Sequence, residues 1–312
     1  MRVNNSYNKV KCSVIILSYN TREITDRCLS LVEVSKKNYE KLSGESLEVI
    51  VIENGSRDGS VDLIKRKYPW INLIQPGINT GFAKGNNLAM KDAQGEYFLL
   101  LNSDAFIKES TFYETLKFME SHTGCDVLGC KLTNEDGSLQ PSTGFLPTPI
   151  NIITWMLAID KLPYIRDKIK SFHPNHRSFF KKVREVEWVT GAFMLIRRMV
   201  YKETGGFDEN FFMYTEEVEW CKRIKERGFK VYYNPEFEAI HLLRASSGYD
   251  IKKPILKEAQ GVIFYFRKHY SNFVWEIKLL LIIGYFWRML FARLIGNSKK
   301  AEAYSLYLFG GG

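Results

Sequence analysis

Three polar residues, Asn102-Ser103-Asp104, directly follow the continuous apolar run Tyr97-Phe98-Leu99-Leu100-Leu101. Such a run is typical of a strand that is buried on both faces of a parallel sheet. The polar side chains would then lie at the carboxyl end of the strand, where open α/β sheets bind their ligands. Amide, hydroxyl and carboxylate oxygens are hard donors that suit Mg²⁺ or Mn²⁺ held jointly with phosphates. An equally simple interpretation is that Asp104 caps a following helix.

Two later segments carry charged side chains that could act on a ligand. Glu216 and Glu217 are adjacent at the predicted amino end of a helix, where the helix dipole alone would favour acids. Glu219 points away from Glu217 on that helix and is expected at a packing or solvent-facing position. His241 ends the last predicted strand, and Arg244 follows it. A lone histidine is more often structural than a ligand, and a lone arginine is commonly solvated, so both interpretations stay open here.

The elements that must position these residues begin as alternating strands and helices. Predicted strands cover residues 12–18, 47–52, 71–74 and 96–101, each followed by a polar turn and a helical pattern. The first helix begins with an Asn20 cap and has Glu23 at its third position. The second begins at Val61, and the third follows a glycine-rich loop over residues 76–87 and continues through Ala93. This alternation predicts βαβ units and a mainly parallel sheet.

Four polar loops therefore meet at one edge of the predicted sheet. They are residues 18–20, 53–56, 79–87 and 102–104, each at the carboxyl end of a strand. Glycines, amides and carboxylates beside helix amino ends suit a nucleotide, because backbone amides face phosphates while side chains read base and ribose. The sequence contains neither a Walker A motif nor GxGxxG, which argues against a P-loop ATPase and a dinucleotide-dependent dehydrogenase.

Length and composition bound the class of protein. The 312 residues allow one large domain with an appendage. The formal net charge of +9 indicates an anionic partner, which could be nucleic acid, a membrane surface or a phosphorylated substrate. The basic residues gather near apolar and aromatic runs and match no nucleic-acid-binding module, so no nucleic acid is expected. Five scattered cysteines without CxxC pairs indicate free thiols, and with no secretory signal at the start this predicts a cytoplasmic protein.

In order and spacing, these loops resemble the motifs of the family 2 glycosyltransferases with the GT-A fold. The segments that carry the resemblance are SVIILSYN (residues 13–20), VIENGSRDGS (51–60), NTGFAKGNN (79–87) and LLNSD (100–104). The similarity extends over about residues 10–250, and the nearest branch resembles the bacterial rhamnosyltransferases of cell-surface polysaccharide synthesis. The resemblance implies a nucleoside-diphosphate sugar donor, a divalent cation and an inverting transfer.

The resemblance also implies roles for individual residues. Asp104, helped by His241, would hold Mg²⁺ or Mn²⁺, and Arg244 would contact phosphate. Glu217 would be the catalytic base, at a position where the family usually has the shorter Asp, so its reach differs by one methylene group. The donor-binding residues would be Tyr19, Asn20, Glu53, Asn54, Asn79, Gly81, Phe82, Lys84, Asn86, Asn87, Asn102, Ser103 and Asp104. The acceptor-side residues would be Trp188, Thr190, Gly191 and Glu216.

The predicted glycosyltransferase domain covers residues 1–250. Residues 1–105 would form its nucleotide-binding half and residues 106–250 its acceptor-side half. In the second half, residues 188–197 are predicted to form one buried strand. Residues 141–185 are irregular and proline-rich, with an apolar island at 150–159. This segment would face the acceptor and touch the membrane, or it would be a surface excursion packed on the core.

Residues 251–312 are predicted to form a helical extension. The stretch 277–295 is strongly apolar but is interrupted by Lys278, Arg288 and Arg293. Its uncharged core is too short to cross a bilayer, which needs about 20 residues. The three cations fall within an arc of about 140° on a helix, which leaves a wide apolar face that includes Trp287. The pattern favours a helix lying in a membrane interface, although a dimer interface or a lid on the core would produce it too.

Taken together, we expect an α/β, GT-A Rossmann-like glycosyltransferase that works by single displacement on the inner face of the cytoplasmic membrane. By resemblance, the donor would be dTDP-rhamnose and the acceptor a polyprenyl-diphosphate-linked saccharide. Two other classes remain open. A sugar nucleotidyltransferase would share the phosphate-binding loops and the metal site but would release pyrophosphate. A non-catalytic carbohydrate-binding or membrane-binding protein would need no metal.

Overall fold

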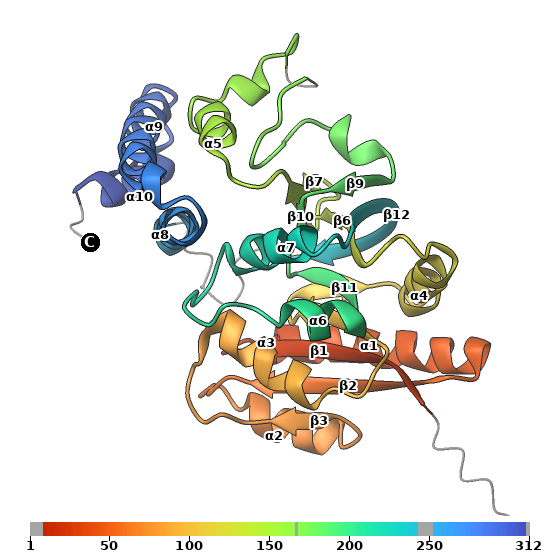
Figure 1. Ribbon diagram of the computed structural model, residues 1–312. Coiled ribbons are helices and arrows are strands. Elements are labelled where there is room, and N and C mark those ends of the chain that lie inside the picture. The colour runs from red at the N-terminus through yellow and green to blue at the C-terminus, as the bar shows by residue number, and fades with distance from the viewer. Residues whose placement is uncertain (1–8, 166–167, 243–251, 310–312) are drawn as a thin grey trace, which may run out of the picture.

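The protein is built around one large sheet, which extends from β3 at the bottom of Figure 1 to β12 in the middle of the view. This computed structural model describes residues 9–165, 168–242 and 252–309. The strand order is β3-β2-β1-β4-β11-β6-β12-β5, with β7 beside β6 and β9 beside β12, while β8 and β10 form a separate pair. The strands are β1 (Val10–Ser18), β2 (Ser46–Glu53), β3 (Asn72–Ile74), β4 (Tyr97–Asn102), β5 (Ala105–Ile107), β6 (Val127–Thr133), β7 (Leu139–Gln140), β8 (Thr143–Gly144), β9 (Arg184–Val186), β10 (Trp188–Val189), β11 (Phe193–Arg197) and β12 (Val231–His241).

The long strands of this sheet share one direction. β1 is parallel to β2 and β4, β2 to β3, and β6 to β12. β11 runs the opposite way between β4 and β6. Because an antiparallel strand begins at the edge where its neighbours end, residues just before β11 reach the same edge as residues just after β4. The mixed α/β architecture with a mostly parallel sheet confirms the predicted fold class.

Helices cover both faces of the sheet. One face packs against α1, α2 and α4, and the other against α3, α6 and α7. The helices are α1 (Arg22–Ser43), α2 (Ser60–Lys67), α3 (Gly81–Asp92), α4 (Thr111–Ser121), α5 (Pro149–Met156), α6 (Arg198–Thr204), α7 (Glu216–Glu226), α8 (Lys252–His269), α9 (Val274–Leu294) and α10 (Ser298–Phe309). All five cysteines are buried free thiols, as the sequence predicted.

The first helix does not begin with the predicted Asn20 cap. α1 begins at Arg22, and its first amide donates to the Asp58 carboxylate at 2.8 Å. Asn20 has a φ of 50°, and its side-chain oxygen accepts from the Arg57 amide at 2.9 Å. The cap predicted from local spacing is therefore replaced by a contact from the loop after β2.

The third helix begins earlier than predicted. α3 starts at Gly81, inside the loop that was expected to extend to Asn87. Gly81 has a φ of 81°, a backbone conformation that glycine adopts without steric cost. The side chains from Phe82 to Asn87 therefore project from a helix rather than from a flexible loop.

Two strands next to the predicted site also differ from the prediction. The interpretation of Asp104 as a helix cap is wrong, because β5 begins at Ala105 instead of a helix. β5 pairs antiparallel with β12, which places His241 opposite Ala105. The single strand predicted over residues 188–197 is two strands, since residues 190–192 separate β10, which pairs with β8, from β11.

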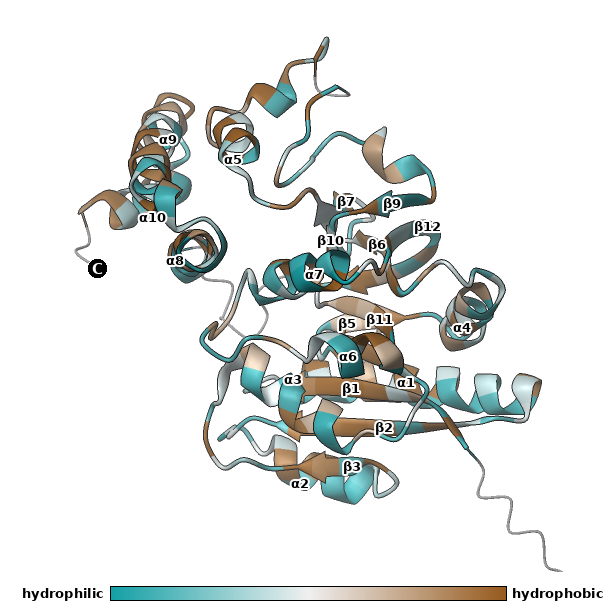
Figure 2. Ribbon diagram, viewed as in Figure 1, coloured by the Kyte–Doolittle hydropathy of each residue, from teal (hydrophilic) through white to brown (hydrophobic). Residues whose placement is uncertain are grey.

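The carboxyl-terminal helices α8, α9 and α10 stand together beside α5 and α7 (Figure 1). α9 buries Ile277, Leu281 and Tyr285 in the main core, so on this face it does act as a lid. Much of its remaining surface is apolar and exposed, and Figure 2 colours most of the helix brown. Within the described ranges, no helix combines the length and the apolar character needed to cross a bilayer.

A helix lying in a membrane interface would direct Arg288 outward, toward lipid headgroups. In the structure, this side chain instead points inward. It donates to the carbonyl of Trp155 in α5, and its guanidinium lies 5.0 Å from the centre of that indole ring. The apolar island that includes α5 is accordingly part core and part surface. Ile152 and Met156 are fully buried, whereas Ile150 is 70% exposed.

Candidate active site

A cavity of about 620 Å³ lies at the edge where β1, β2 and β4 end. Its walls come from the loops after these strands, from residues 188–192 before β11, from residues 212–218 and from the start of α8. Asp104 and Glu217 line the same cavity, which is the arrangement on which the predicted chemistry depends. The predicted site residues that line it are Tyr19, Asn54, Asn79, Gly81, Phe82, Asn102, Ser103, Asp104, Trp188, Thr190, Gly191, Glu216, Glu217 and His241.

Asn54 joins two of the loops at this edge of the sheet. Its side-chain oxygen accepts from the amide and the hydroxyl of Thr80 at 2.9 and 2.8 Å. Its amide nitrogen donates to Asn79 Oδ1 at 3.0 Å, and Asn54 itself is 1% exposed. Because buried amides with all their groups bonded are costly to move, this network fixes the loop before α3 against the end of β2.

Gly81 and Gly191 allow two other segments to approach the same helix start. The amide of Phe82 donates to the carbonyl of Phe212 at 2.8 Å, and a Cβ at Gly81 would lie 2.6 Å from that oxygen. A Cβ at Gly191 would lie 2.8 Å from the Phe82 ring. Phe82 therefore lies between the segment before β11 and the segment before α7, and it ties both sides of the cavity to α3.

Asp104 lies beside His241 because β5 pairs with β12. The Oδ1 atom of Asp104 is 3.1 Å from Nε2 of His241, and both side chains are about one tenth exposed. Nδ1 of His241 lies 2.6 Å from Gln140 Oε1, which can only accept, so the ring carries a proton on Nδ1. In the neutral ring, Nε2 then has a free electron pair at the cavity, next to the amide of Asn102 at 3.1 Å.

This donor set fits a divalent cation. A carboxylate oxygen and an imidazole nitrogen 3.1 Å apart can contact one ion together, and both are ligands that Mn²⁺ accepts. Gln140 orients the imidazole in the way that outer partners orient metal-binding histidines. Across the described residues, no third histidine, cysteine or acid completes a metal-binding cluster. The remaining positions around an ion would therefore belong to substrate phosphates and water.

Glu216 and Glu217 follow a strained turn. Tyr214 and Thr215 both have a φ of 75°, a conformation that is rare outside glycine and costs of order 1–3 kcal/mol per residue. α8 packs closely on this turn, because a Cβ at Gly261 would lie 2.6 Å from Thr215 Oγ1. The turn aims the first residues of α7 at the cavity, and strained backbone of this kind concentrates at functional sites.

Burial favours the protonated form of both acids. Burial, together with the neighbouring charge of Glu217, raises the pKa of Glu216 well above its usual value. Burial raises the pKa of Glu217 to about 7, and the nearby His173 opposes this rise. The Oε2 atoms of both acids are buried and have no hydrogen-bond partner among the described residues. With a pKa of about 7, Glu217 can exchange a proton near neutral pH.

A family model described as Glycosyl transferase family 2 matches residues 13–205. This chain is a family 2 glycosyltransferase. The match confirms the predicted family and the predicted class of enzyme. It decides against the two alternatives, a sugar nucleotidyltransferase and a non-catalytic binding protein.

Relatives of named activity are similar to most of this glycosyltransferase. Rhamnosyltransferase WbbL of Escherichia coli is 25% identical over 237 residues, which cover 73% of this chain and 82% of that protein. An N-acetylglucosaminyl-diphospho-decaprenol L-rhamnosyltransferase of Mycobacterium tuberculosis is 27% identical over 215 residues, 65% of this chain and 69% of that protein. The fold is similar to the mannosyltransferase PcManGT from Pyrobaculum calidifontis, solved with GDP-Man and Mn²⁺. That match has a TM-score of 0.57 at 15% identity and covers 97% of this chain and 76% of the other.

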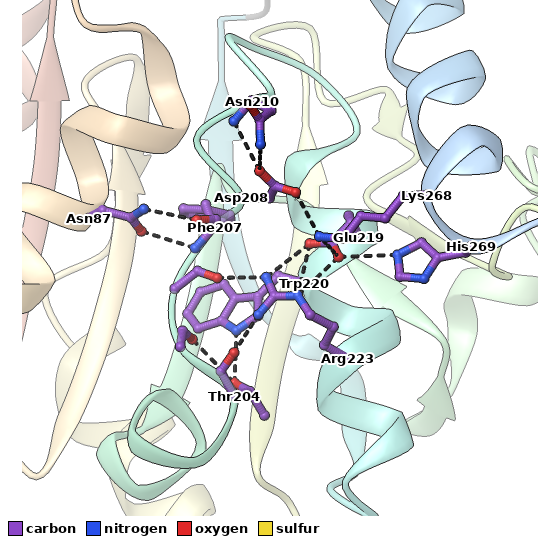
Figure 3. A network of polar contacts seen from close by, with 12 residues as sticks. Asn87, Thr204, Phe207, Asp208, Asn210, Glu219, Trp220, Arg223, Lys268 and His269 are labelled. Atoms are coloured by element: carbon purple, nitrogen blue, oxygen red, sulfur yellow. Dashed lines mark hydrogen bonds and ion pairs between the residues drawn. The ribbon is translucent and has the colours of Figure 1, made fainter. Parts of the chain in front are cut away.

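The third acid of α7, Glu219, holds this helix of the glycosyltransferase in place (Figure 3). It is fully buried, so the predicted packing position is confirmed and a solvent-facing one is excluded. Arg223 donates to both of its oxygens at 3.0 Å, and Lys268 and His269 of α8 contact it at 2.8 and 3.1 Å. Burial alone would raise the pKa of Glu219, but hydrogen bonds from His269, Arg223 and Lys268 lower it to about 2.

Further bonds extend this network to α3 and to the turn before α7. Arg223 also donates to the carbonyls of Thr204 and Gly206. Asn87 exchanges two hydrogen bonds of 2.9 Å with the backbone of Phe207. Asp208 accepts from Lys268 at 2.6 Å. The network in Figure 3 thus fixes α7, and with it Glu217, against both α3 and α8.

Some predicted site residues lie outside the cavity. Glu53 is 2% exposed, and its carboxylate accepts from the Ser56 amide at 3.1 and 3.2 Å, so it shapes its own turn. Asn86 is buried and donates to the carbonyl of Phe82 at 2.9 Å. Lys84 is exposed on α3. The structure does not bring Asn20 or Asn87 to the cavity either, and Arg244 lies outside the described residues.

The cavity also contains residues that the sequence analysis did not single out. Gln140 comes from the short strand β7, His173 from the irregular segment before β9, and Lys253, Lys257 and Glu258 from the start of α8. His173 Nε2 lies 2.8 Å from Glu258 Oε1. The two lysines are four residues apart on a helix, which is a signal that the sequence does contain. Gln140 and His173 carry no such signal, since long-range pairing alone brings them to the site.

Proposed function

We propose that this glycosyltransferase moves L-rhamnose from dTDP-rhamnose to a saccharide carried on a polyprenyl diphosphate, with inversion at the anomeric carbon. The observation that carries the proposal is the single cavity lined by both Asp104 and Glu217. The sugar and the acceptor class are supported by the two rhamnosyltransferases above, one of which is named for a diphospho-decaprenol acceptor.

Residues 1–105 would bind the donor. Tyr19 and Asn54 line the cavity at the ends of β1 and β2, where they would contact the base and ribose. Glu53 would support them by holding the turn after β2 in shape. Asn79, Gly81 and the start of α3 would position ribose, phosphate and sugar, since the helix dipole favours anionic groups at a helix amino end.

Asp104 and His241 would hold Mg²⁺ or Mn²⁺, with Asn102 and Ser103 beside them. Once bound there, the cation would neutralise charge on the departing nucleoside diphosphate, a Lewis-acid contribution worth several kcal/mol. Glu217 would accept the proton of the acceptor hydroxyl as its oxygen attacks the anomeric carbon opposite the leaving group. General-base assistance of this kind typically contributes 10²–10⁴-fold.

The acceptor saccharide would enter between residues 188–191 and α7. Trp188 is 3% exposed, and its indole nitrogen donates to the Phe145 carbonyl at 3.1 Å, so it is a rigid part of the wall. Thr190 and Gly191 line the cavity directly. Burial favours the protonated form of Glu216, which would donate a hydrogen bond to a sugar hydroxyl, as an ionised carboxylate cannot do.

The reaction is tested with a panel of nucleotide sugars and a lipid-diphosphate-linked N-acetylglucosamine acceptor. We expect release of dTDP from dTDP-rhamnose that depends on the acceptor and on Mg²⁺ or Mn²⁺, with an inverted linkage by NMR. Faster turnover of a mannose, glucose or galactose donor would refute the choice of rhamnose. Release of pyrophosphate, or turnover without any divalent cation, would refute the proposed chemistry.

The enzyme is further proposed to work against the inner face of the cytoplasmic membrane, through α9. Apolar side chains recur on its outer surface at helical spacing, and they include Trp275 at 77% and Phe291 at 63% exposed. A flotation assay with phospholipid vesicles tests this placement. We expect wild-type protein to float with the vesicles, while exchanging Trp275 and Phe291 for Ser should reduce the bound fraction without changing the melting temperature. Equal flotation of both proteins would refute the placement.

A further inference from the structure

A second cavity of about 460 Å³ adjoins the catalytic one. The two share a wall made by Phe212, Met213, Tyr214 and Lys257. All the residues that line the second cavity lie between Asn210 and Lys278, so none belongs to the nucleotide-binding half. An occupant of this cavity would therefore contact the catalytic centre from the acceptor side and not from the donor side.

The second cavity is lined by cations and by no acid. Lys257 and Arg267 come from α8 and Lys278 from the second turn of α9. The Nζ atom of Lys257 lies 4.1 Å from the centre of the Phe212 ring, and that of Lys278 lies 4.6 Å from the centre of the Trp275 ring. Throughout the described part of the chain, no carboxylate forms an ion pair with any of these three side chains.

The cations follow one side of α8 toward the catalytic cavity. Lys253, Lys257 and Arg267 are spaced by four and ten residues, so on a helix they fall within about 80° of one another. Other lysines of α8 are neutralised, since Lys252 pairs with Glu302 and Lys268 with Asp208 and Glu219. Like charges gathered in one place repel one another. Burial and the neighbouring Lys253 lower the pKa of Lys257, and the nearby Glu216 opposes this change. An anion at this position would relieve that repulsion.

We propose that the second cavity binds the diphosphate of the lipid-linked acceptor. This assignment rests on the proposed function and names the part of the acceptor that the catalytic cavity leaves unbound. With the diphosphate between Lys257, Arg267 and Lys278, the attached saccharide would reach across the shared wall to Glu217. The lipid chain would leave along the exposed apolar surface of α9, which continues from Lys278 through Leu279 and the following turns.

The test replaces the two cations farthest from the catalytic cavity. Arg267→Gln and Lys278→Gln are made singly and together in the full chain. Arg293→Gln serves as the matched control, because Arg293 is an exposed cation on the same apolar helix but does not line the cavity. Each protein is assayed with farnesyl-diphosphate-linked N-acetylglucosamine and with octyl N-acetylglucosaminide, which has an apolar tail and no diphosphate.

For the diphosphate-linked acceptor, we expect KM to rise about tenfold or more in each single variant and further in the double variant, because each loses a charge-assisted contact. The KM of the donor and the rate with the octyl acceptor should match the wild type, as should all constants of Arg293→Gln. Farnesyl diphosphate alone should inhibit the wild type competitively and inhibit the double variant at least tenfold more weakly.

Three results would overturn the assignment. The first is an equal loss with both acceptors, and the second is an equal loss in Arg293→Gln. The third is unchanged kinetics together with weaker flotation on phosphatidylglycerol vesicles that lack acceptor, because this would make the cations a site for lipid headgroups. If the wild-type protein transfers sugar to both acceptors and the variants have the same kinetic constants, only the proposed diphosphate site is refuted. If wild-type protein transfers sugar to neither, the proposed function itself fails.

Discussion

In the proposed reaction, Glu217 must be ionised to accept a proton from the acceptor, and its surroundings resist ionisation. Burial raises its pKa from the usual 4.5 to about 7. With that pKa, about one tenth of the enzyme carries an ionised Glu217 at pH 6 and about nine tenths at pH 8. We therefore expect kcat/KM for the acceptor to rise about tenfold from pH 6 to pH 8, because this constant reports the free enzyme. A glutamate with its usual pKa would change the rate by only a few per cent.

The assay measures release of nucleoside diphosphate at saturating divalent cation, from pH 5.5 to 8.5. Glu217→Gln should lower kcat by about 10²–10⁴-fold and remove the rise with pH, while donor affinity stays unchanged. Glu216→Gln is the matched control. Glutamine keeps the uncharged form that burial favours at this position, so the rise with pH should persist in that variant. A flat profile in the wild type, or a rise that survives in Glu217→Gln, would refute the assignment of the base.

Stability provides a second measurement on the same residue. A carboxyl group whose pKa is higher in the folded than in the unfolded protein stabilises the fold fully below the unfolded value of about 4.5 and loses this contribution as the pH rises through about 7. Glu217→Gln removes that loss. At each pH, the free energy of unfolding of the wild type is subtracted from that of the variant. This difference should be about 1–3 kcal/mol larger at pH 8 than at pH 5. Urea unfolding at the two pH values gives the difference, and no change in it would contradict the raised pKa.

Three further substitutions test the cavity and the residues that hold it in shape. Asp104→Asn should weaken donor binding at least tenfold in Mn²⁺ but not in EDTA by calorimetry, and an unchanged Mn²⁺ dependence would count against a metal ligand here. Gly81→Ala should lower the free energy of unfolding by about 1–3 kcal/mol, more than Gly77→Ala, because both have a φ near 80° but only Gly81 has a carbonyl oxygen where the Cβ would lie. Glu219→Gln should cost about 3–5 kcal/mol at pH 7, because Arg223 and Lys268 lose their buried counter-ion. In the wild type, the stabilisation by ionised Glu219 is present above pH 4.5 and should fade as the pH falls toward 2. Equal urea midpoints for the wild type and Glu219→Gln at pH 7 would contradict this stabilisation.

The loops that line the cavity at the ends of β1, β2 and β4 could be predicted from the sequence because their signals are local. Each of the loops at residues 18–20, 53–56 and 102–104 ends an apolar run long enough to identify a buried strand. The errors came where local signals were ambiguous. β5 has only three residues and follows Asp104 directly, so a helix cap was an equally good interpretation. The apolar pattern of residues 188–197 runs on through a turn, which concealed that β10 and β11 belong to different sheets.

The acceptor side depends on pairings between distant segments. Gln140 reaches His241 because β7 pairs with β6, and β6 pairs with β12. His173 reaches Glu258 because the irregular segment packs near α8. Nothing in the residues around Gln140 or His173 indicates these contacts. Arg288 shows the same limit, since its helical position predicted exposure, whereas packing of α9 on α5 directed it inward.

The segment over residues 145–187 leaves and re-enters the fold at neighbouring points, because Gly144 pairs with Trp188 and Thr143 with Val189 in the β8–β10 sheet. Loop-closure entropy grows slowly with length, so the clasp itself sets little limit on the length of the segment between its two strands. A replacement segment would still have to fill the core where Ile152 and Met156 are buried. Under the proposed function, a chimaera joined at this clasp would change the acceptor, while the loops before residue 105 would keep the donor.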